Sequence, residues 1–217
     1  MKITIPGLLL INGGQGLGKS HLIKYLISTH KDKFDYGLVF CNTSFDISDK
    51  SSFDYIPKKY VHAEYDEVIL SKFMDIQAKL VKQGIVKEAF IIFDDCLDIE
   101  MFNTNCFKRL VTQLRHYHIT VFLSTQYPNA VSPRTRNNCM QVVIFYTDTE
   151  VALKALHGSF GQQWSFKEFK KLVMDSCIDH AFLYYNKKEQ DPKIRYQVLR
   201  APKTIKSFKV TYNTSIT

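Results

Sequence analysis

Residues 13–20 form a glycine-rich run, Gly-Gly-Gln-Gly-Leu-Gly-Lys-Ser, that matches the pattern G-x-x-x-x-G-K-[ST]. Glycines allow the backbone to curl so that successive N–H groups point at phosphate oxygens, and a helix that begins near Lys19 adds the positive end of its dipole. In such a loop Lys19 reaches the β and γ phosphates, and the hydroxyl of Ser20 binds Mg²⁺. The pattern predicts a site for ATP and Mg²⁺, formed by Gly13, Gly14, Gln15, Gly16, Leu17, Gly18, Lys19, Ser20 and His21.

A second set of candidate residues is the acidic pair Asp94 and Asp95, which directly follows an apolar run at residues 89–93. A continuous apolar run of this length is typical of a strand buried on both faces. At the end of such a strand we expect Asp94 to hold Mg²⁺, and Asp95 to accept a proton from the attacking water or to orient it. Side chains alternate along a strand, so the alternative role for Asp95 is to cap the next segment.

The next apolar run, at residues 119–123, also ends in polar residues. In ATPases that insert a strand between the phosphate loop and the acidic strand, this position carries a polar residue that senses the γ-phosphate. Gln126 is the candidate for contact with the γ-phosphate or its water, and Ser124 and Thr125 are alternates. A polar residue that only ends the strand is the other interpretation.

A motor ATPase also needs a positive charge that completes the transition state, often supplied by a neighbouring subunit. Arg115 precedes the sensor strand, and Arg134 and Arg136 follow it. We expect all three to lie near the nucleotide end of the sheet, with Arg115 as the favoured arginine finger and the other two as alternatives. The competing interpretation for each is a helix-terminal or surface charge.

Apolar runs and amphipathic segments alternate along the chain. Short apolar runs predict strands at residues 7–11, 36–41, 89–93, 119–123 and 142–146, and helical spacing predicts helices at residues 21–29, 66–81, 106–118, 149–157 and 165–176. This alternation implies a parallel sheet covered by helices on both faces, with ligands at the carboxyl ends of the strands. The sequence therefore predicts an α/β fold of the P-loop NTPase class (ASCE or RecA-like).

The last part of the chain differs in pattern and charge. Residues 181–185 and 194–199 are expected to pair as an antiparallel β-hairpin around residues 187–193. We expect one domain, with a P-loop ATPase core at residues 1–150 and a basic extension at 151–217 that adds two helices and the hairpin. Residues 151–217 hold 12 basic and 5 acidic residues, against 17 and 16 in residues 1–150, so nearly all of the net charge of +8 lies there.

A basic segment of this kind favours a polyanionic partner, nucleic acid first, although a solvated surface has the same composition. Contact with DNA phosphates would be salt-dependent and largely independent of base sequence. The candidates for such contacts are Lys187, Lys188, Lys193, Arg195 and Arg200.

Composition excludes several other classes of protein. Of the 217 residues, 45% are hydrophobic and 23% are charged, so the chain has enough apolar side chains to bury a core and is not disordered throughout. No run approaches 18 consecutive apolar residues, so a transmembrane helix is not expected. Five cysteines without a C-x-x-C pair argue against a disulfide scaffold or a zinc site and favour a reducing compartment.

Four segments together resemble the poxvirus-type DNA-packaging ATPases of the FtsK–HerA superfamily, which occur in large double-stranded DNA viruses, virophages and related elements. These segments are Phe93-Asp94-Asp95-Cys96, Leu114-Arg115-His116, residues 120–126, and Arg136-Asn137-Asn138. The resemblance covers roughly residues 5–147.

This resemblance implies a ring of subunits that drives double-stranded DNA into a preformed capsid, in the virion or the host cytoplasm and not secreted. It implies partners among other copies of the chain, DNA, and capsid or membrane-associated virion proteins. By position, Lys19, Ser20, Asp94, Asp95 and Gln126 form the catalytic set, and Arg115 acts on the neighbour's ATP. The superfamily often has Glu at this position. Asp95 is one methylene shorter and reaches less far, so the assignment of Asp95 as the base departs from the family pattern.

Three other functions share some of these motifs. A helicase loader or transposition helper shares nearly all of them and is the main alternative. A P-loop nucleotide kinase is favoured less, because the acidic pair and the terminal Gln126 suit water as the acceptor. A GTPase is favoured least, because Asn186-Lys187-Lys188-Glu189 has Glu where the guanine-reading pattern N-K-x-D needs Asp.

Overall fold

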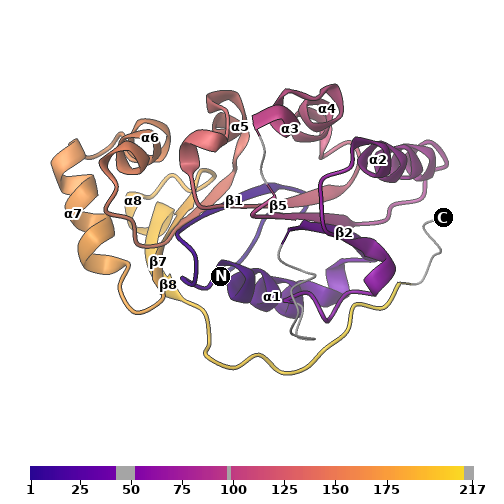
Figure 1. Cartoon of the computed structure of the whole chain (residues 1–217), viewed down its shortest axis with the longest axis horizontal. Helices are drawn as coiled ribbons and strands as arrows, with labels where there is room; N and C mark the ends of the chain where they lie inside the picture. Colours follow the sequence, from indigo (N-terminus) through magenta and orange to yellow (C-terminus); the bar gives the residue numbers. More distant parts are fainter. Residues whose placement is uncertain (43–51, 97–98, 213–217) are drawn as a thin grey trace.

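A computed structural model describes residues 1–42, 52–96 and 99–212 of the protein. Across these residues an eight-stranded sheet has the strand order β3-β2-β4-β5-β1-β6-β7-β8 (Figure 1). Neighbouring strands from β3 to β6 pair in parallel, whereas the β6–β7 and β7–β8 pairs are antiparallel. The strands are β1 (Leu8–Asn12), β2 (Tyr36–Cys41), β3 (Val61–His62), β4 (Ala89–Asp94), β5 (Ile119–Thr125), β6 (Gln141–Ile144), β7 (Ala181–Asn186) and β8 (Tyr196–Arg200).

Helices cover both faces of the sheet (Figure 1). One face carries α2 (Glu67–Lys82), α3 (Ile99–Asn103), α4 (Asn105–Gln113), α5 (Pro133–Asn138), α6 (Glu150–Phe160) and α7 (Phe166–Ser176), and the other carries α1 (Lys19–His30). The apolar side chains divide accordingly into two buried clusters, one on each side of the strands. Because both faces are covered, β1, β2, β4 and β5 are buried along their whole length, as their continuous apolar runs predict.

Local signals fix where several helices begin. The side chain of Asp66 accepts hydrogen bonds from the backbone N–H groups of Val68 and Ile69 and caps α2. Ser165 and Glu168 form a reciprocal capping box at the start of α7. These caps satisfy backbone donors that a helix start leaves unpaired, so the local sequence marks the first residue of both helices.

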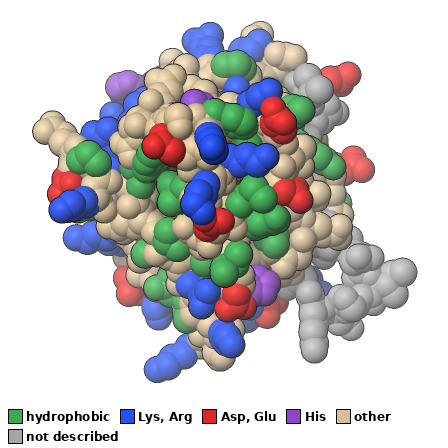
Figure 2. All heavy atoms as spheres, turned by 90° about the vertical axis from the view of Figure 1, so that its left-hand side faces the viewer, with side chains coloured by type: hydrophobic (Ala, Val, Ile, Leu, Met, Phe, Trp, Pro, Cys, Tyr) green, Lys and Arg blue, Asp and Glu red, His purple; other side chains and the backbone are tan. Residues whose placement is uncertain are grey.

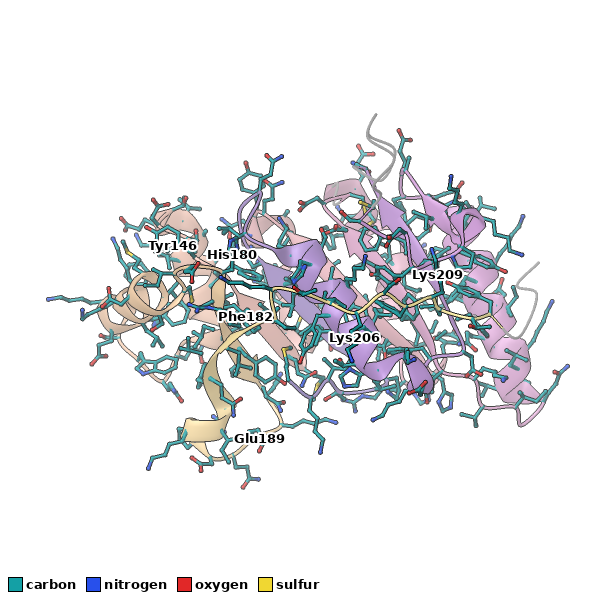
Figure 3. The ribbon with its side chains drawn as sticks, turned by 90° about the horizontal axis from the view of Figure 1, so that it is seen from below. Tyr146, His180, Phe182, Glu189, Lys206 and Lys209 are labelled. Carbon is teal, nitrogen blue, oxygen red and sulfur yellow. The ribbon has the colours of Figure 1, made fainter. Side chains whose placement is uncertain are left out.

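Residues 201–212, here called the C-terminal strap, leave β8 and cross the α1 side of the molecule in extended form (Figures 1 and 3). The backbone N–H of Val210 donates to the carbonyl of Tyr55 at 2.9 Å. The Tyr212 ring stacks on Tyr60 with centroids 4.4 Å apart, and its hydroxyl donates to the carbonyl of Gly37 at 2.7 Å. The strap therefore ties the last strand back to the β2 side of the sheet.

The predicted fold class is confirmed, including the hairpin of β7 and β8. Two predicted elements were too long. The helix predicted at residues 106–118 ends at Gln113, and the turn that follows includes His118 at φ +51°. Residues 194 and 195 are not in the strand but in a short helix, α8 (Pro192–Arg195), because Asp191 caps it and Pro192 begins it.

The predicted absence of a transmembrane helix agrees with the structure, in which no helix of the described segments is both long and apolar enough to cross a bilayer. All five cysteines are buried in the two apolar clusters.

Candidate nucleotide site

Strand β1 leads directly into the phosphate loop. The strand ends at Asn12 and α1 begins at Lys19, so residues 13–18 form the whole connection. Gly16 and Gly18 have φ values of +75° and +99°, in the left-handed region that favours glycine. A Cβ atom on Gly13 would lie 2.7 Å from the Cβ atom of Phe145, so this position has no room for a side chain. Glycine is therefore required at Gly13 for lack of space and favoured at Gly16 and Gly18 by the left-handed backbone.

Lys19 points back into the loop from the first residue of α1. Its side chain is almost completely buried, and Nζ donates to the carbonyl of Gly14 at 3.2 Å. The same Nζ lies 3.1 Å from Oδ2 of Asp95. The ammonium group thus lies between the phosphate loop and the acidic strand, where the β and γ phosphates of a nucleotide would lie.

Ser20 and Asp94 meet although 74 residues separate them in the sequence. The Ser20 hydroxyl donates to Oδ2 of Asp94 at 2.6 Å. Asp94 is 2% exposed, and burial raises the pKa of its carboxyl group above the ordinary value, while the hydrogen bond from Ser20 opposes that shift. Its other oxygen, Oδ1, is buried and accepts no hydrogen bond within the described part of the chain.

A hydroxyl and a carboxylate with one unpartnered buried oxygen fit a small divalent cation. Mg²⁺ prefers oxygen ligands and usually keeps several waters, with one or two carboxylates and substrate phosphates completing its shell. Ser20 and Asp94 are the residues that would hold it, as the sequence predicts.

Asp95 follows the end of β4 and turns toward the phosphate loop. Its backbone has φ +48°, an uncommon conformation for a residue other than glycine. Oδ2 accepts a hydrogen bond from Nε2 of Gln126 at 3.3 Å, in addition to its ion pair with Lys19. The structure therefore brings Asp95, Gln126 and Lys19 together, and the left-handed backbone explains how adjacent acids on one strand both reach the site.

The two alternates to Gln126 are less suited to contact a nucleotide. Ser124 is completely buried and lies opposite Asp94 in the register of β4 and β5. Thr125 exchanges hydrogen bonds with the backbone of Tyr127. Gln126, the first residue after the strand, is the one whose side chain donates to Asp95.

Asn12 is a site residue that the sequence analysis missed. It is 1% exposed, and its Nδ2 donates to the carbonyls of Thr125 and Gln126 at 3.3 and 3.4 Å. A buried amide in this place ties the start of the phosphate loop to the sensor segment. The available signal was a polar residue placed between an apolar run and the first glycine.

A hollow of about 380 Å³ opens beside Gln126. Its walls include Gly14 and Gln15 of the phosphate loop, and also Tyr127 and Val151. Tyr127 and Val151 are 72% and 62% exposed, so two large side chains of this wall face solvent. This part of the site is therefore open to approach from outside the subunit.

The expectation that three arginines lie near the nucleotide end is wrong for Arg115. In a parallel sheet the phosphate loop lies at the carboxyl end of β1, whereas Arg115 follows α4 and precedes β5, at the amino ends of the strands. Its Nη2 lies 3.4 Å from Sδ of Met140, which directly precedes β6. Arg115 is exposed there, so it is excluded from the nucleotide site of its own subunit and is accessible to a neighbour.

Arg136 is committed to its own subunit. Only 9% of it is exposed, and Nη1 donates to the carbonyls of Pro128 and Val131 while Nε donates to the hydroxyl of Ser159. These bonds hold the segment after β5 against α6. Arg134 lies on the same short helix, α5, and is exposed. Of the two alternative fingers, Arg134 is the one whose side chain is exposed.

The five candidate DNA contacts do not form one group. Lys187, Lys188, Lys193 and Arg195 belong to the tip of the β7–β8 hairpin, which extends from the body near Glu189 in Figure 3. Arg200 lies at the other end of the hairpin, opposite Ala181, where it pairs with Asp179 at 3.4 Å. On the face over α6, α7 and the hairpin, Figure 2 shows Lys and Arg side chains interspersed with acidic ones.

The fold and the site define the chain as a P-loop NTPase of the class in which one strand, here β5, lies between the phosphate-loop strand and the acidic strand. The chain belongs to the family of protein 075L of invertebrate iridescent virus 6, with 30% identity over 189 residues that cover 84% of this chain and 71% of that protein. Protein L437 of Acanthamoeba polyphaga mimivirus is 25% identical over 210 residues, 91% of this chain and 72% of that protein. No model of a protein family matches the sequence.

Solved structures share this fold. The genome-packaging NTPase B204 from Sulfolobus turreted icosahedral virus 2, in complex with ATP-γ-S, superposes with a TM-score of 0.64 and 19% identity over 90% of this chain and 97% of that one. The pCW3 conjugation coupling protein TcpA superposes with a TM-score of 0.58 and 14% identity over 85% of this chain and 58% of that one. The fold that the sequence predicts is therefore shared with a genome-packaging NTPase and with a conjugation coupling protein.

Proposed function

We propose that this protein is an ATP-hydrolysing motor that translocates double-stranded viral DNA into a preformed capsid. The observation that carries the proposal is the convergence of Lys19, Gln126 and Asp95 beside the Ser20–Asp94 pair. A phosphate loop that only binds nucleotide needs no second acid with an amide on it. The similarity of the fold to that of B204, over nearly all of that chain, supports packaging as the use of this chemistry.

Each residue of the site has a defined task in hydrolysis. Lys19 and the loop N–H groups bind the phosphates, and Ser20 and Asp94 hold Mg²⁺, which when bound neutralises charge on the β and γ phosphates. Asp95 accepts the proton of the attacking water, and Gln126 orients that water through its contact with Asp95. Because Lys19 and Asp95 are paired at 3.1 Å in this structure, an incoming triphosphate competes with Asp95 for the ammonium group and releases the carboxylate for its role as base.

In the proposed ring, a neighbouring subunit supplies the arginine whose positive charge completes the transition state. Arg115 is exposed and lies at the edge of the sheet opposite the phosphate loop of its own subunit, so its action on ATP has to be in trans. The open hollow beside Gln126, with the exposed Tyr127, provides the surface on which a neighbour would dock. Arg134 is the alternative finger.

The proposed DNA contacts lie at the same edge of the sheet as Arg115. The backbone N–H of Lys187 donates to the carbonyl of Met140 at 2.8 Å, and Arg115 lies against the sulfur of that same residue. The basic hairpin tip and the proposed finger are thus joined through Met140, so a shift of Arg115 on hydrolysis moves the tip. Lys187, Lys188 and Lys193 are the proposed phosphate contacts, and capsid or membrane-associated virion proteins are the proposed docking partners in the virion or host cytoplasm.

The test is ATP hydrolysis by the purified protein with and without linear duplex DNA, at rising salt. We expect Mg²⁺-dependent turnover that DNA stimulates and that fades as salt displaces the phosphate contacts. Lys19→Ala is the control for contaminating ATPases and should abolish turnover. Turnover that does not respond to DNA, with phosphate transferred to an added nucleotide, would identify a kinase. DNA-dependent ATP binding without translocation, measured as failure to displace a third strand from a DNA triplex, would identify a loader.

A further inference from the structure

Strand β8 forms an open edge of the sheet (Figure 1). It lies last in the strand order, and the strap leaves it after Arg200 and crosses the α1 side. Val198, in the middle of the strand, is 48% exposed. The other edge strand, β3, has two residues and is too short to accept a further strand. Among the described strands, β8 is therefore the edge on which another strand can pair.

The register shows which backbone groups of β8 face outward. In an antiparallel pair, successive residues bond alternately to one side and to the other. The N–H of Lys187, directly after β7, donates to the carbonyl of Met140 at 2.8 Å, so odd-numbered residues of β7 bond toward β6 and even-numbered ones toward β8. Phe182 pairs with Leu199, so the odd-numbered residues of β8 bond to β7.

The even-numbered residues of β8, which are Tyr196, Val198 and Arg200, therefore point their backbone groups away from the sheet. The N–H of Tyr196 agrees with this orientation, because it donates to the carbonyl of Pro192. The backbone N–H and C=O groups of Val198 and Arg200 form no hydrogen bond with any other described residue. Unpaired groups of this kind at the edge of a sheet are a ready template for an incoming strand.

Positive charge borders this edge. The segment 193–203 holds four basic residues and no acidic one. Arg200 is balanced by Asp179 at 3.4 Å, whereas Lys193 and Lys203, before and after the strand, are exposed. Two copies of this edge would bring like charges together, so the composition disfavours β8–β8 pairing between subunits. An acidic strand is attracted instead.

The edge suits a peptide better than DNA. The DNA backbone is anionic but offers acceptors only, so it would leave the carbonyl groups of Val198 and Arg200 unpaired. A peptide strand offers both N–H and C=O groups at the spacing of β8. The side chain of Val198 lies on the same face as Tyr196, whose ring contacts Trp164 with centroids 4.3 Å apart. An apolar side chain of an added strand would therefore cover Val198 beside that aromatic pair.

We propose that β8 binds an extended segment of another protein as an added strand, in which apolar residues on the face of Val198 alternate with acidic residues. The backbone of this segment bonds to Val198 and Arg200, and its carboxylates lie near Lys193 and Lys203. The nucleotide takes no part in the contact, so the inference is independent of the proposed function.

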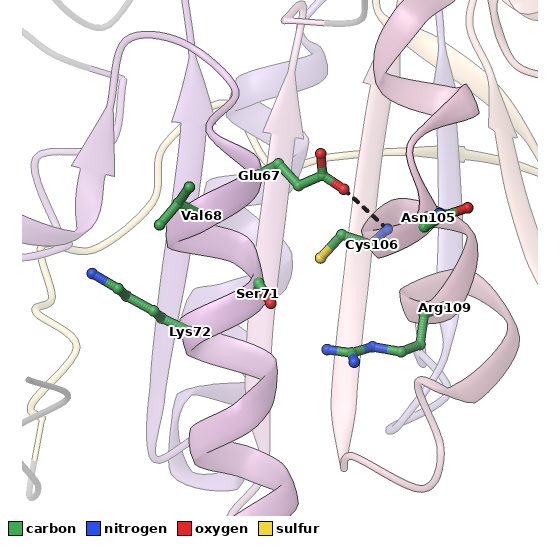
Figure 4. Close-up of a pocket in the computed structure, with 7 residues that line it drawn as sticks. All are labelled: Glu67, Val68, Ser71, Lys72, Asn105, Cys106 and Arg109. Carbon is green, nitrogen blue, oxygen red and sulfur yellow. Dashed lines mark hydrogen bonds between the residues drawn. The ribbon is translucent and has the colours of Figure 1, made fainter.

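A hollow of about 540 Å³ between α2 and α4 is a weaker candidate for a partner site (Figure 4). Its walls are helices, whose backbone groups bond within the helix. At the start of α4 the N–H of Cys106 donates to Glu67 at 3.2 Å, and the side chain of Arg109 donates to Asp75 at 3.3 Å. The hollow therefore lacks the row of unpaired donors and acceptors that β8 presents.

Hydrogen exchange of the backbone amides in the full chain tests both the orientation of β8 and the binding. The probe is a capped six-residue peptide that alternates valine with glutamate, and the matched control alternates valine with lysine. In the free protein we expect rapid exchange at Val198 and Arg200 and slow exchange at Gln197 and Leu199. The glutamate peptide should slow exchange at Val198 at least about tenfold and bind at least about tenfold more tightly than the lysine peptide.

Variants separate the backbone contribution from the charge. Val198→Pro removes the outward N–H but leaves the bonds of Gln197 and Leu199 to β7, so it should abolish binding of the glutamate peptide. Val198→Thr keeps the N–H and should still bind. Lys203→Glu should weaken binding several-fold, whereas Lys206→Glu, the same change of charge further along the strap, should not. Slow exchange at Leu199 in Val198→Pro shows that the hairpin is intact.

Several results would overturn the proposal. Failure of the glutamate peptide to bind, or equal affinity for the two peptides, would remove the acidic partner. Binding that leaves exchange at Val198 unchanged would place the peptide elsewhere. A concentration-dependent dimer, measured by sedimentation and lost in Val198→Pro, would assign the edge to a second copy of the chain. Protection of Val198 by duplex DNA but not by the peptide would assign it to DNA. ATP turnover is unaffected in each case, so the proposed function stands or falls separately.

Discussion

The buried carboxylate of Asp94 costs the nucleotide-free protein stability. Burial raises the pKa of Asp94 in the folded state, so the folded protein holds the proton more tightly than the unfolded chain does. Above the raised pKa both states are ionised, and the folded state then carries the full desolvation penalty. Asp94→Asn should therefore stabilise the protein at neutral pH without Mg²⁺ or nucleotide, by about 0.5–2 kcal/mol. A gain of this size is common when a destabilising group is removed from a functional site.

Thermal unfolding at several pH values measures this effect. For a chain of this length, 1 kcal/mol corresponds to a shift of roughly 2–4 °C in Tm. The advantage of Asp94→Asn should shrink as pH falls through the raised pKa of Asp94, because the wild-type carboxyl is then protonated and neutral. A variant less stable than the wild type at neutral pH would show instead that the Ser20–Asp94 bond outweighs the desolvation penalty.

Asp95 and Asp94 should respond differently to the same substitution. Asp95→Asn should keep ATP binding, because Lys19 loses a competitor for the phosphates, but lower the rate of hydrolysis by about 10²–10⁴-fold through loss of the base. Asp95→Glu is the matched control and should retain measurable turnover, since it keeps the carboxylate. ATP binding by titration and single-turnover hydrolysis separate the two effects. Loss of ATP binding in Asp95→Asn would make Asp95 a structural or metal-binding residue.

The residue scale is where the sequence was most informative. The proximity of Lys19, Ser20 and Asp94 was predictable because the phosphate loop and the acid at the end of a buried strand are local patterns, and parallel strands bring those ends together. The contact between Gln126 and Asp95 depends on the left-handed backbone of Asp95, which no local pattern encodes. Arg115 was misplaced because its position depends on the path of α4 back to the amino ends of the strands.

At the scale of elements, the strap should be held mainly by Tyr212. Its ring stacks on Tyr60 with an interplanar angle of 5°, and its hydroxyl bonds to Gly37. Tyr212→Phe removes one hydrogen bond and should cost about 1 kcal/mol of unfolding free energy. Tyr212→Ala also removes the stacked ring and should cost about 2–3 kcal/mol.

Denaturant unfolding of both variants measures these costs, and Lys206→Ala, an exposed change on the same strap, should stay within about 0.5 kcal/mol of the wild type. Because His21 is bonded to Pro202, a loosened strap should also weaken ATP binding. Equal stability of Tyr212→Ala and the wild type would mean that the strap is not docked in solution.

The core elements followed from the sequence, whereas the strap did not. Each continuous apolar run became a buried strand, because helices cover both faces of the sheet and remove any need for alternation. The strap has no helical spacing and forms no strand pairing, so periodicity gave no element there. Its side chains do alternate, with Phe208, Val210 and Tyr212 packed on the apolar cluster of the α1 side, and this alternation was a usable signal.

At the scale of the whole molecule, nucleotide chemistry and the basic hairpin tip lie at opposite edges of one sheet. The phosphate loop and acidic pair stand at the carboxyl ends of the parallel strands. Arg115 and Met140 stand at the edge where the parallel strands begin, and Lys187 lies at the same edge because it follows the antiparallel strand β7. In the proposed ring, the amino edge of one subunit faces the nucleotide of the next. Such a heterologous interface closes into a ring when the rotation between neighbouring subunits closes.

Mixed rings test that arrangement. Arg115→Ala alone should lower turnover by about 10³–10⁵-fold, as loss of an arginine finger does, and Lys19→Ala alone should be inactive. In an equal mixture, a subunit with Arg115→Ala keeps its phosphate loop and can receive Arg115 from a Lys19→Ala neighbour. Random mixing in a head-to-tail ring should then restore roughly a quarter of the wild-type rate per site.

The matched mixture of Arg134→Ala with Lys19→Ala tests the alternative finger. If the Arg115 mixture stays inactive while the Arg134 mixture recovers from an equally severe defect, Arg134 is the trans residue; if Arg115→Ala alone keeps the wild-type rate, Arg115 takes no part in hydrolysis.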